Sequence, residues 1–226
     1  DKLFSIIAHD LRSPMNGFLG LTSIMADEIE ALSTKEIQRM SVSMHTAALN
    51  INRLLENLLE WSKMQRGTTY VDPVNVALKS AIKKNIDLMK PYAVGKGIEI
   101  TSKIPNHLIV FADIHLFDTV VRNLLSNAIK FSEKGRSVHI SAAENGNMDI
   151  IISVSDKGIG MNTDQLSALF ELSTNKPGRK GTAGEPSSGL GLLLCKEFAE
   201  RNGGKIWAES KENQGSTFFV SVPVAN

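Results

Sequence analysis

The residues near the start of the chain that are best suited to group-transfer chemistry are His9 and its neighbours. Asp10 follows His9 directly, and Ser13 lies four residues after it. Residues four apart share one face of a helix, and a carboxylate next to an imidazole can orient it and stabilise its charge. His9 therefore fits a phosphoryl acceptor or a general base. A surface histidine without a chemical role shows the same pattern.

A second set of polar side chains recurs at helical spacing further along the chain: Asn123, Asn127 and Lys130. Asn127 falls within the apolar arc of its predicted helix, where an unpaired carboxamide costs about 1–3 kcal/mol. Two interpretations follow. Either Asn127 is bonded to neighbouring backbone, or its oxygen coordinates a hard cation such as Mg²⁺, with Lys130 placed to meet phosphate.

Asp156 ends a strand-like segment in which alternate residues are apolar, and the same alternation carries its carboxylate toward the core. A carboxylate in that position needs hydrogen-bond partners. Gly158 and Gly160 follow, and glycines let a ligand approach the backbone closely. Asp156 thus suits the exocyclic amine of an adenine, although Asp-Lys-Gly also fits an ordinary turn.

The loop 176–188 is rich in glycine and basic residues, and it leads into Gly189, Leu190 and Gly191 at the start of a helix. The free N–H groups at a helix N-terminus bind phosphate. The segment therefore predicts a phosphate cradle beside a mobile basic lid. A flexible linker has the same composition.

Two long helices are predicted to carry and position His9. Apolar residues recur every seven residues along the first: Phe4, Leu11, Phe18 and Met25. In this register His9 points furthest from the apolar seam. The second helix opens with a capping box from Ser33 to Glu36 and ends near Gly67. Its apolar stripe is too wide for one partner, which predicts that two hairpins form a four-helix bundle. Packing of the hairpin against a domain of the same protein that is missing from this sequence is the alternative.

From residue 68 onward the pattern mixes helices and strands. We expect helices at 78–93, 114–131, 163–170 and from 189, strands at 98–104, 138–143, 148–156, 205–209 and 216–222, and short extended pieces at 74–76 and 109–111. Gly95 and Gly97 are expected to end the first of these helices. The predicted fold class is α+β: a helical hairpin, residues 1–67, followed by an α/β sandwich, residues 68–226, with helices on one face of a largely antiparallel sheet.

Composition excludes several classes of protein. The 226 residues carry a net charge of +1, which gives no sign of a nucleic-acid binder or of contact with an anionic membrane. The single cysteine cannot form an internal disulfide, and no apolar run approaches the roughly 20 residues that span a bilayer. The chain begins inside an amphipathic helix. We therefore expect a cytoplasmic piece of a longer protein.

The motifs together resemble those of one family. Four motifs occur in the order and spacing of the Bergerat-type ATPase fold: NxxxNAxK at 123–130, DxGxG at 156–160, GLG at 189–191 and GST at 215–217. HDLRSP at 9–14 resembles the H-box of sensor histidine kinases. The whole chain is similar to the transmitter core of these kinases, including those of hybrid two-component systems.

The resemblance implies a role for each of these residues. His9 would be phosphorylated, with Asp10 as its acid/base partner and Ser13 beside it. Asn123, Asn127 and Lys130 would hold magnesium and phosphates, with Asn127 as the metal ligand, and Asp156 would read adenine. The nucleotide would be lined by Gly158, Gly160, Phe170, Gly189, Leu190, Gly191 and Thr217.

The resemblance further implies ATP and Mg²⁺ as cofactors, autophosphorylation of His9, and transfer to an aspartate of a response-regulator receiver, in trans or fused in the full-length chain. The chain would form a homodimer through its hairpin, and the full-length protein would be anchored in the inner membrane. Two alternatives stay open. One is another ATPase of the same fold, although the glutamate that would activate water is missing near Asn123. The other is a non-catalytic dimeric scaffold, against which the intact nucleotide motifs argue.

Overall fold

The computed structural model describes residues 2–65, 71–146, 148–171, 179–185 and 190–225, without the side chains of 2–10, 13, 50, 53, 54, 56, 57, 60–65 and 190. The chain divides into two compact units, residues 1–69 and 70–226.

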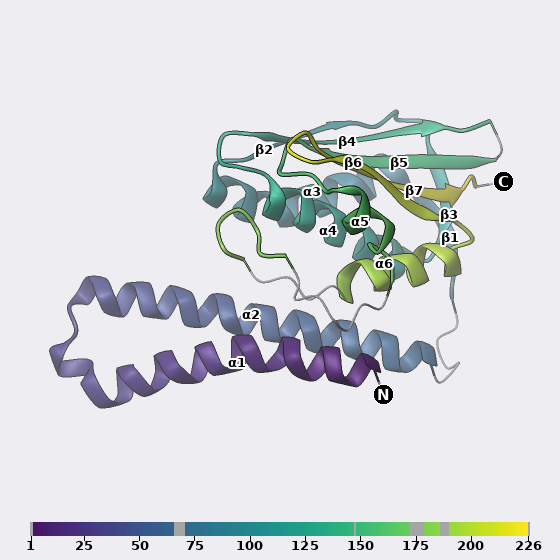
Figure 1. Cartoon of the computed structure of the whole chain (residues 1–226). Helices are drawn as coiled ribbons and strands as arrows, with labels where there is room; N and C mark the ends of the chain where they lie inside the picture. The colour runs from purple at the N-terminus through teal and green to yellow at the C-terminus, as the bar shows by residue number, and fades with distance from the viewer. Residues whose placement is uncertain (1, 66–70, 147, 172–178, 186–189, 226) are drawn as a thin grey trace. The chain divides into compact units, whose positions relative to one another are not determined.

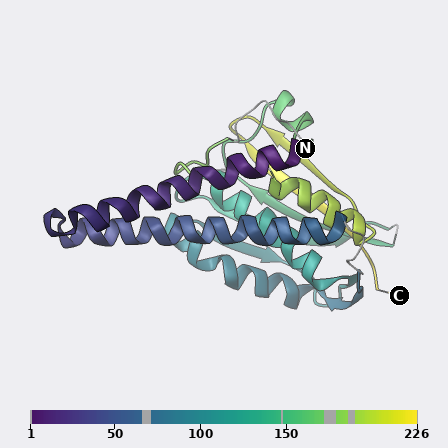
Figure 2. The ribbon, with the colours of Figure 1, turned by 90° about the horizontal axis from the view of Figure 1, so that it is seen from below.

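The first unit is an antiparallel pair of helices, α1 (Lys2–Glu28) and α2 (Thr34–Gln65), joined by the short 3₁₀ helix η1 (Ile29–Ala31) (Figure 2). The capping box predicted at the start of α2 is confirmed. The Glu36 N–H donates to Ser33 Oγ at 3.3 Å, and the Ser33 N–H donates to Glu36 Oε2 at 2.8 Å. These reciprocal bonds satisfy backbone donors that a helix start leaves unpaired, and so fix where α2 begins.

The second unit is built on a five-stranded sheet in the order β2-β4-β5-β7-β6. Its strands are β2 (Glu99–Lys103), β4 (Ser137–Glu144), β5 (Asp149–Asp156), β6 (Ile206–Lys211) and β7 (Gly215–Pro223). Only β2 and β4 pair in parallel; the other three pairings of this sheet are antiparallel. A separate antiparallel pair is formed by β1 (Val74–Ala77) and β3 (Ile109–Ala112).

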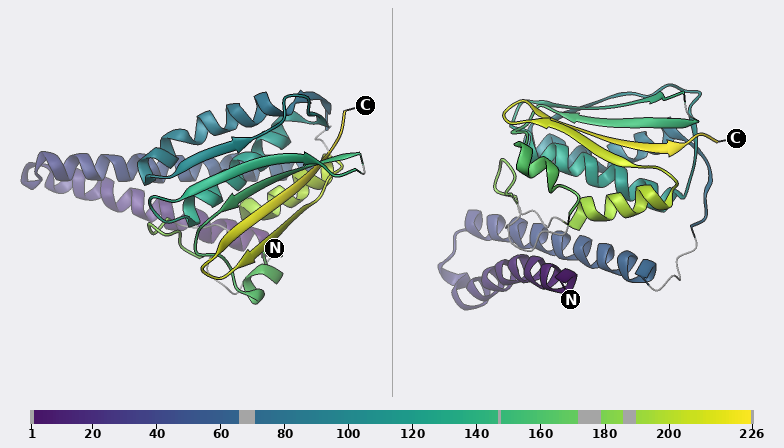
Figure 3. Two further views of the ribbon diagram at one scale, coloured as in Figure 1. Left: turned by 90° about the horizontal axis from the view of Figure 1, so that it is seen from above. Right: turned by 45° about the vertical axis from the view of Figure 1, so that its right-hand side comes forward.

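Three helices cover one face of the sheet: α3 (Leu78–Lys96), α4 (Ile114–Phe131) and α6 (Leu190–Arg201) (Figure 1). The opposite face of the sheet is seen in the left view of Figure 3. Alternate strand residues such as Ile140, Ile152 and Val154 are fully buried, as are Leu124 and Leu125 of α4. This layer of helices on a sheet, after a helical hairpin, confirms the predicted α+β fold class. Among the described residues, every helix is too short or too polar to cross a bilayer.

Two predicted helix ends were wrong. Helix α3 continues through Gly95 to Lys96, because a single glycine within a helix costs only about 1 kcal/mol. It ends at Gly97, whose φ of 69° places it in the left-handed region that glycine tolerates. Helix α5 (Thr163–Ser167) stops three residues before Phe170, and turns follow it.

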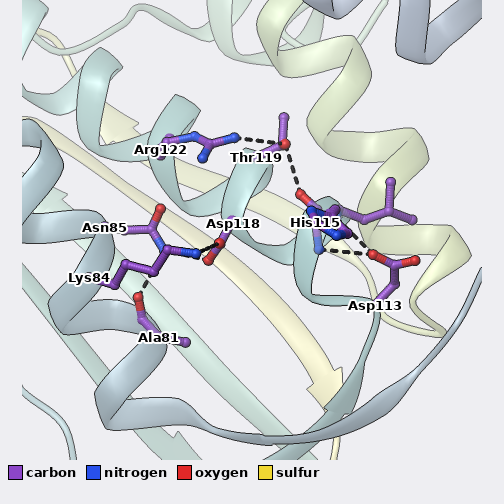
Figure 4. Close-up of polar contacts among 9 residues, drawn as sticks. Ala81, Lys84, Asn85, Asp113, His115, Asp118, Thr119 and Arg122 are labelled. Atoms are coloured by element: carbon purple, nitrogen blue, oxygen red, sulfur yellow. Dashed lines mark hydrogen bonds and ion pairs between the residues drawn. The ribbon is translucent and has the colours of Figure 1, made fainter.

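The beginning of α4 is fixed by polar contacts (Figure 4). Asp113 caps the helix, and its Oδ1 accepts from the His115 N–H at 2.9 Å and the Leu116 N–H at 3.2 Å. One turn on, the buried Asp118 accepts from Asn85 Nδ2 and Lys84 Nζ of α3, each at 2.7 Å. These contacts hold α4 in one position along α3, and α4 carries the polar residues singled out above.

Candidate functional site

Asn123 lies on the side of α4 that faces the first turn of α6. Its side chain is 8% exposed, and its Nδ2 donates to the Thr119 carbonyl at 3.0 Å. A Cβ placed at Gly191 would lie 3.0 Å from Asn123 Oδ1, closer than most side chains approach. The structure therefore brings Asn123 and Gly191 together, and Gly191 is the residue that lets α6 begin so close to α4.

Asn127 lies one turn further along α4 and is half-buried. Asn123, not Asn127, is thus the more buried of the two amides, and Gly191 of α6 packs against it. The Asn127 carboxamide makes no hydrogen bond within the described part of the chain. A half-buried carboxamide oxygen of this kind is a suitable ligand for a hard cation.

Lys130 is in the last turn of α4 and is also half-buried. Its ammonium group lies 5.2 Å from the centre of the Phe131 ring, within the range of a cation–π contact. Asn123, Asn127 and Lys130 therefore follow one side of α4 toward its carboxyl end, as their spacing predicted.

Asp156 ends β5 with its side chain only 5% exposed. Its Oδ1 accepts from the Gly158 N–H at 2.8 Å and from the Ser216 N–H at 3.3 Å. Burial raises the pKa of Asp156 to about 6, and the two N–H donors oppose that rise. Within the described residues nothing donates to Oδ2. The carboxylate is thus fixed by one oxygen, and the other can accept a hydrogen bond from a ligand.

The two glycines after Asp156 are required by their surroundings. A Cβ at Gly158 would collide with the carbonyl oxygen of Phe131, at the end of α4. Gly160 has a φ of 58°, and its carbonyl accepts from Arg179 Nη1 at 2.6 Å. This loop therefore packs its backbone directly against α4, which brings Asp156 and the α4 residues into one region.

The side chain of Thr217, a predicted site residue, is not brought to this region. In the β5–β7 register Asp156 is opposite Ser216, whereas Thr217 is opposite Ser155 and lies 2.9 Å from its hydroxyl. Side chains of successive strand residues point to opposite faces, so Thr217 lies on the face away from Asp156. Ser216 was missed: its backbone N–H is the contact, and only the pairing of β5 with β7 reveals it.

The other predicted residues are placed less completely. Phe170 is half-buried in the turns after α5. Gly189 lies outside the described residues, as do 176–178 and 186–188 of the predicted lid, and Leu190 is described only as the first residue of α6. His9, Asp10 and Ser13 lie within α1, which also contains Pro14, but their side chains are not described.

Comparison with known proteins matches both units to family models. Residues 112–226 match the histidine kinase-, DNA gyrase B- and HSP90-like ATPase family. Residues 1–67 match the His Kinase A phospho-acceptor domain. The first of these matches covers the region of Asn123, Asp156 and Gly191, and the second covers His9.

Individual proteins agree with these matches. The adaptive-response sensory kinase SasA of Synechocystis sp. is 30% identical over 233 residues, which cover 99% of this chain and 59% of that kinase. The histidine kinase AdeS of Acinetobacter baumannii has the same fold, with a TM-score of 0.74, 19% identity, and coverage of 96% of this chain and 98% of that one. The histidine kinase ThkA, solved in complex with the response regulator TrrA, has a TM-score of 0.71 and 19% identity, covering 100% of this chain and 62% of that one.

The chain thus spans little more than half the length of its sensory-kinase relative. Both of its units match, in the order that the H-box and the ATPase motifs required. The chain belongs to the sensor histidine kinase family and contains its phospho-acceptor domain and its ATPase domain.

Proposed function

We propose that this chain is the catalytic core of a two-component sensor kinase, which phosphorylates His9 from ATP and then passes the phosphoryl group to an aspartate of a response-regulator receiver. One observation carries the proposal. Three elements meet in one region: the side of α4 that carries Asn123 and Asn127, the start of α6, and the loop that follows Asp156. Together they offer groups for both ends of ATP.

At the adenine end, Asp156 supplies the acceptor. Because Oδ1 is held by the N–H groups of Gly158 and Ser216, Oδ2 is left in a defined direction for the exocyclic amine. Gly158 and Gly160 would let the base lie against the backbone. An adenine held in this way would be distinguished from guanine, which presents a carbonyl oxygen at the same position and would face a carboxylate.

At the phosphate end, the residues present fit a magnesium ion. In the described part of the chain there is no group of three acidic, histidine or cysteine side chains that could hold a metal by itself. An ion bound through Asn127 and phosphate oxygens matches the preference of Mg²⁺ for few protein ligands. When bound, Mg²⁺ neutralises phosphate charge. Asn123, Lys130 and the α6 start at Gly191 would complete the contacts to the triphosphate.

The chemistry at His9 follows from its neutral imidazole. One ring nitrogen attacks the γ-phosphorus, the bond from that phosphorus to the β,γ-bridging oxygen breaks, and ADP leaves. Asp10 would accept a hydrogen bond from the other ring nitrogen and stabilise the positive charge that develops on the ring. His9 and Asp156 belong to different units, so the transfer would need groups from both.

The proposed partners follow from the two units. Residues 1–67 would form the dimerisation and histidine phosphotransfer domain, and residues 68–226 the ATP-binding domain. The structure of ThkA with TrrA supports a receiver as the partner, and the phospho-acceptor family match supports a homodimer through the hairpin. We place this core in the cytoplasm, within a longer protein anchored in the inner membrane.

Incubation with γ-labelled ATP and magnesium tests this function. Label that is lost in acid and retained in base identifies a phosphohistidine. Absence of such label, with ATP bound, would instead support a non-catalytic scaffold. Release of labelled inorganic phosphate without labelling of the protein would support another ATPase of the same fold.

The raised pKa of Asp156 predicts a pH-dependent affinity for ATP. Only the ionised carboxylate leaves both oxygens as acceptors, so binding should strengthen as the pH rises through about 6 and then level off. Below that pH the affinity should fall by up to about tenfold for each pH unit. Titration calorimetry of wild type and Asp156→Asn from about pH 5 to about pH 8 measures this. The variant should bind more weakly with a flat profile, and a flat profile in wild type would refute the role.

Ser13 is expected to act on the receiver rather than on His9. It lies four residues after His9 on α1, and its hydroxyl could orient a water toward a phospho-aspartate. Ser13→Ala should slow receiver dephosphorylation about fivefold, the effect of one neutral hydrogen bond, and leave autophosphorylation unchanged. Both rates are measured on labelled proteins. Equal dephosphorylation by the two proteins, or a matching fall in autophosphorylation, would contradict a dedicated role.

A further inference from the structure

Lys96, the last residue of α3, holds three parts of the second unit together. Its side chain is 13% exposed. Its ammonium group donates to the carbonyls of Ile129 at 3.0 Å and Lys130 at 2.5 Å, and to Glu185 Oε1 at 2.7 Å. The three N–H bonds of an ammonium group match these three acceptors. The two carbonyls belong to the end of α4, where the helix dipole favours a cation.

Glu185 belongs to a compact turn, residues 181–185. The Gly181 N–H donates to the Glu185 carbonyl at 2.8 Å, and the Ala183 N–H donates to Glu185 Oε2 at 2.9 Å. Burial of the Glu185 carboxylate opposes its ionisation, but the hydrogen bonds from Lys96 and from backbone N–H groups outweigh that effect and lower its pKa. The pair is therefore an ion pair at neutral pH.

The turn 181–185 is docked on the carboxyl end of α4 by further contacts. The Thr182 N–H donates to the Lys130 carbonyl at 3.1 Å, and Thr182 Oγ1 donates to the Ser132 carbonyl at 2.6 Å. Gly181 packs on the Lys130 side chain so closely that a Cβ there would lie 2.6 Å from Lys130 Cγ. The turn thus forms one wall against the stem of Lys130.

We propose that Lys96 and Glu185 are positioning residues for the nucleoside triphosphate: their ion pair docks the turn 181–185 on α4 and so directs Lys130 toward the phosphates. This inference rests on the proposed function, in which Lys130 meets phosphate. Lys96 itself touches the end of α4 and the turn, and it acts on the nucleotide only through Lys130. Without the ion pair, the turn keeps, among its described polar contacts with α4, those of Thr182, and the Lys130 stem loses its wall.

A second lysine of α3 provides a matched control. Lys83 pairs with Asp87 at 2.6 Å, but the two side chains are 73% and 56% exposed. Exposed pairs of this type contribute little to stability. Lys83→Met therefore removes the same charge from the same helix without disturbing the turn.

The first measurement needs no nucleotide. Trypsin cleaves after Arg179 and Lys180, which are exposed and directly precede the turn. Lys96→Met should speed cleavage at these two bonds about tenfold, since it removes the charge-assisted contact to Glu185 and the ammonium donor to the Ile129 and Lys130 carbonyls, of which the Lys130 carbonyl keeps the Thr182 N–H. Glu185→Gln should have a smaller effect, and Lys96→Arg should restore slow cleavage. The double variant Lys96→Glu with Glu185→Lys, which exchanges the two charges, should not restore slow cleavage, because the new carboxylate at position 96 would face the carbonyls of α4. Unchanged cleavage in Lys96→Met, relative to Lys83→Met, would overturn the proposal.

The second measurement is the affinity for a non-hydrolysable ATP analogue with magnesium, by calorimetry. Lys96→Met should weaken it about fivefold, with rescue by Lys96→Arg and no change in Lys83→Met. Faster cleavage with unchanged affinity would overturn the positioning role. If wild type binds no analogue at all, the proposed function fails as well, while the trypsin result still reports whether the turn is docked by Lys96.

Discussion

His9→Gln is expected to abolish labelling of the protein by γ-labelled ATP. The amide nitrogen of glutamine has its lone pair delocalised into the carbonyl, so it cannot attack phosphorus as a neutral imidazole does. The side chain remains polar and helix-compatible, so the hairpin and the ATPase domain should be unaffected. Autoradiography of the purified protein, with ATP affinity and dimer mass measured in parallel, checks this expectation.

The chain supplies its own control for that experiment. His45 lies on an exposed position of α2, in the same unit as His9. His45→Gln should label like wild type, because nothing places it as an acceptor. Label retained in His9→Gln but lost in His45→Gln would identify His45 of α2 as the acceptor. Label retained in both variants would place it outside the hairpin histidines.

Asn127→Ala is expected to have the second largest effect. Removing the carboxamide removes the one protein ligand proposed for magnesium, so the gain in ATP affinity that magnesium gives should fall by at least about tenfold. Asn127→Asp should also lose this gain, because its charge repels the phosphates. The measurement is calorimetry with ATP, in the presence of magnesium and in the presence of a chelator.

Asn75 offers a comparison on the same unit. It is exposed on β1, and Asn75→Ala should leave both affinities unchanged. An unchanged affinity for magnesium-ATP in Asn127→Ala would show that the Asn127 side chain has a structural role only. A fall in affinity that is equal with and without magnesium would assign the amide to the nucleotide rather than to the metal.

Sequence reasoning succeeded where the determinants are local. The structure has α4 at the bounds that the pattern predicted, Ile114–Phe131, because helical periodicity is a property of that one segment. The inward direction of Asp156 followed from strand alternation and is confirmed by its burial. The capping box at Ser33 needed only four residues of sequence.

It failed where the determinants are distant in the chain. Thr217 was assigned to the nucleotide from a motif, yet its direction depends on which residue of β5 it faces. The parallel pairing of β2 with β4 was not foreseen, since it requires the chain to pass through β3 and α4 between them. Lys96 and Glu185 are 89 residues apart, and neither belongs to a motif. Contacts of this kind depend on the assembled fold and leave no periodic trace.

The position of β7 in the sheet has a consequence for how the protein is made. β7 lies between β5 and β6 although it follows both in sequence. Asp156 leaves the ribosome 60 residues before Ser216, a delay of roughly 3 to 12 s at ordinary rates of translation. During this interval one edge of β5 has no neighbouring strand, and the Asp156 carboxylate has only the Gly158 N–H of its two donors. The nascent sheet therefore exposes an unpaired hydrogen-bonding edge until the last strand is inserted, and the second backbone donor to Asp156 arrives only with that strand.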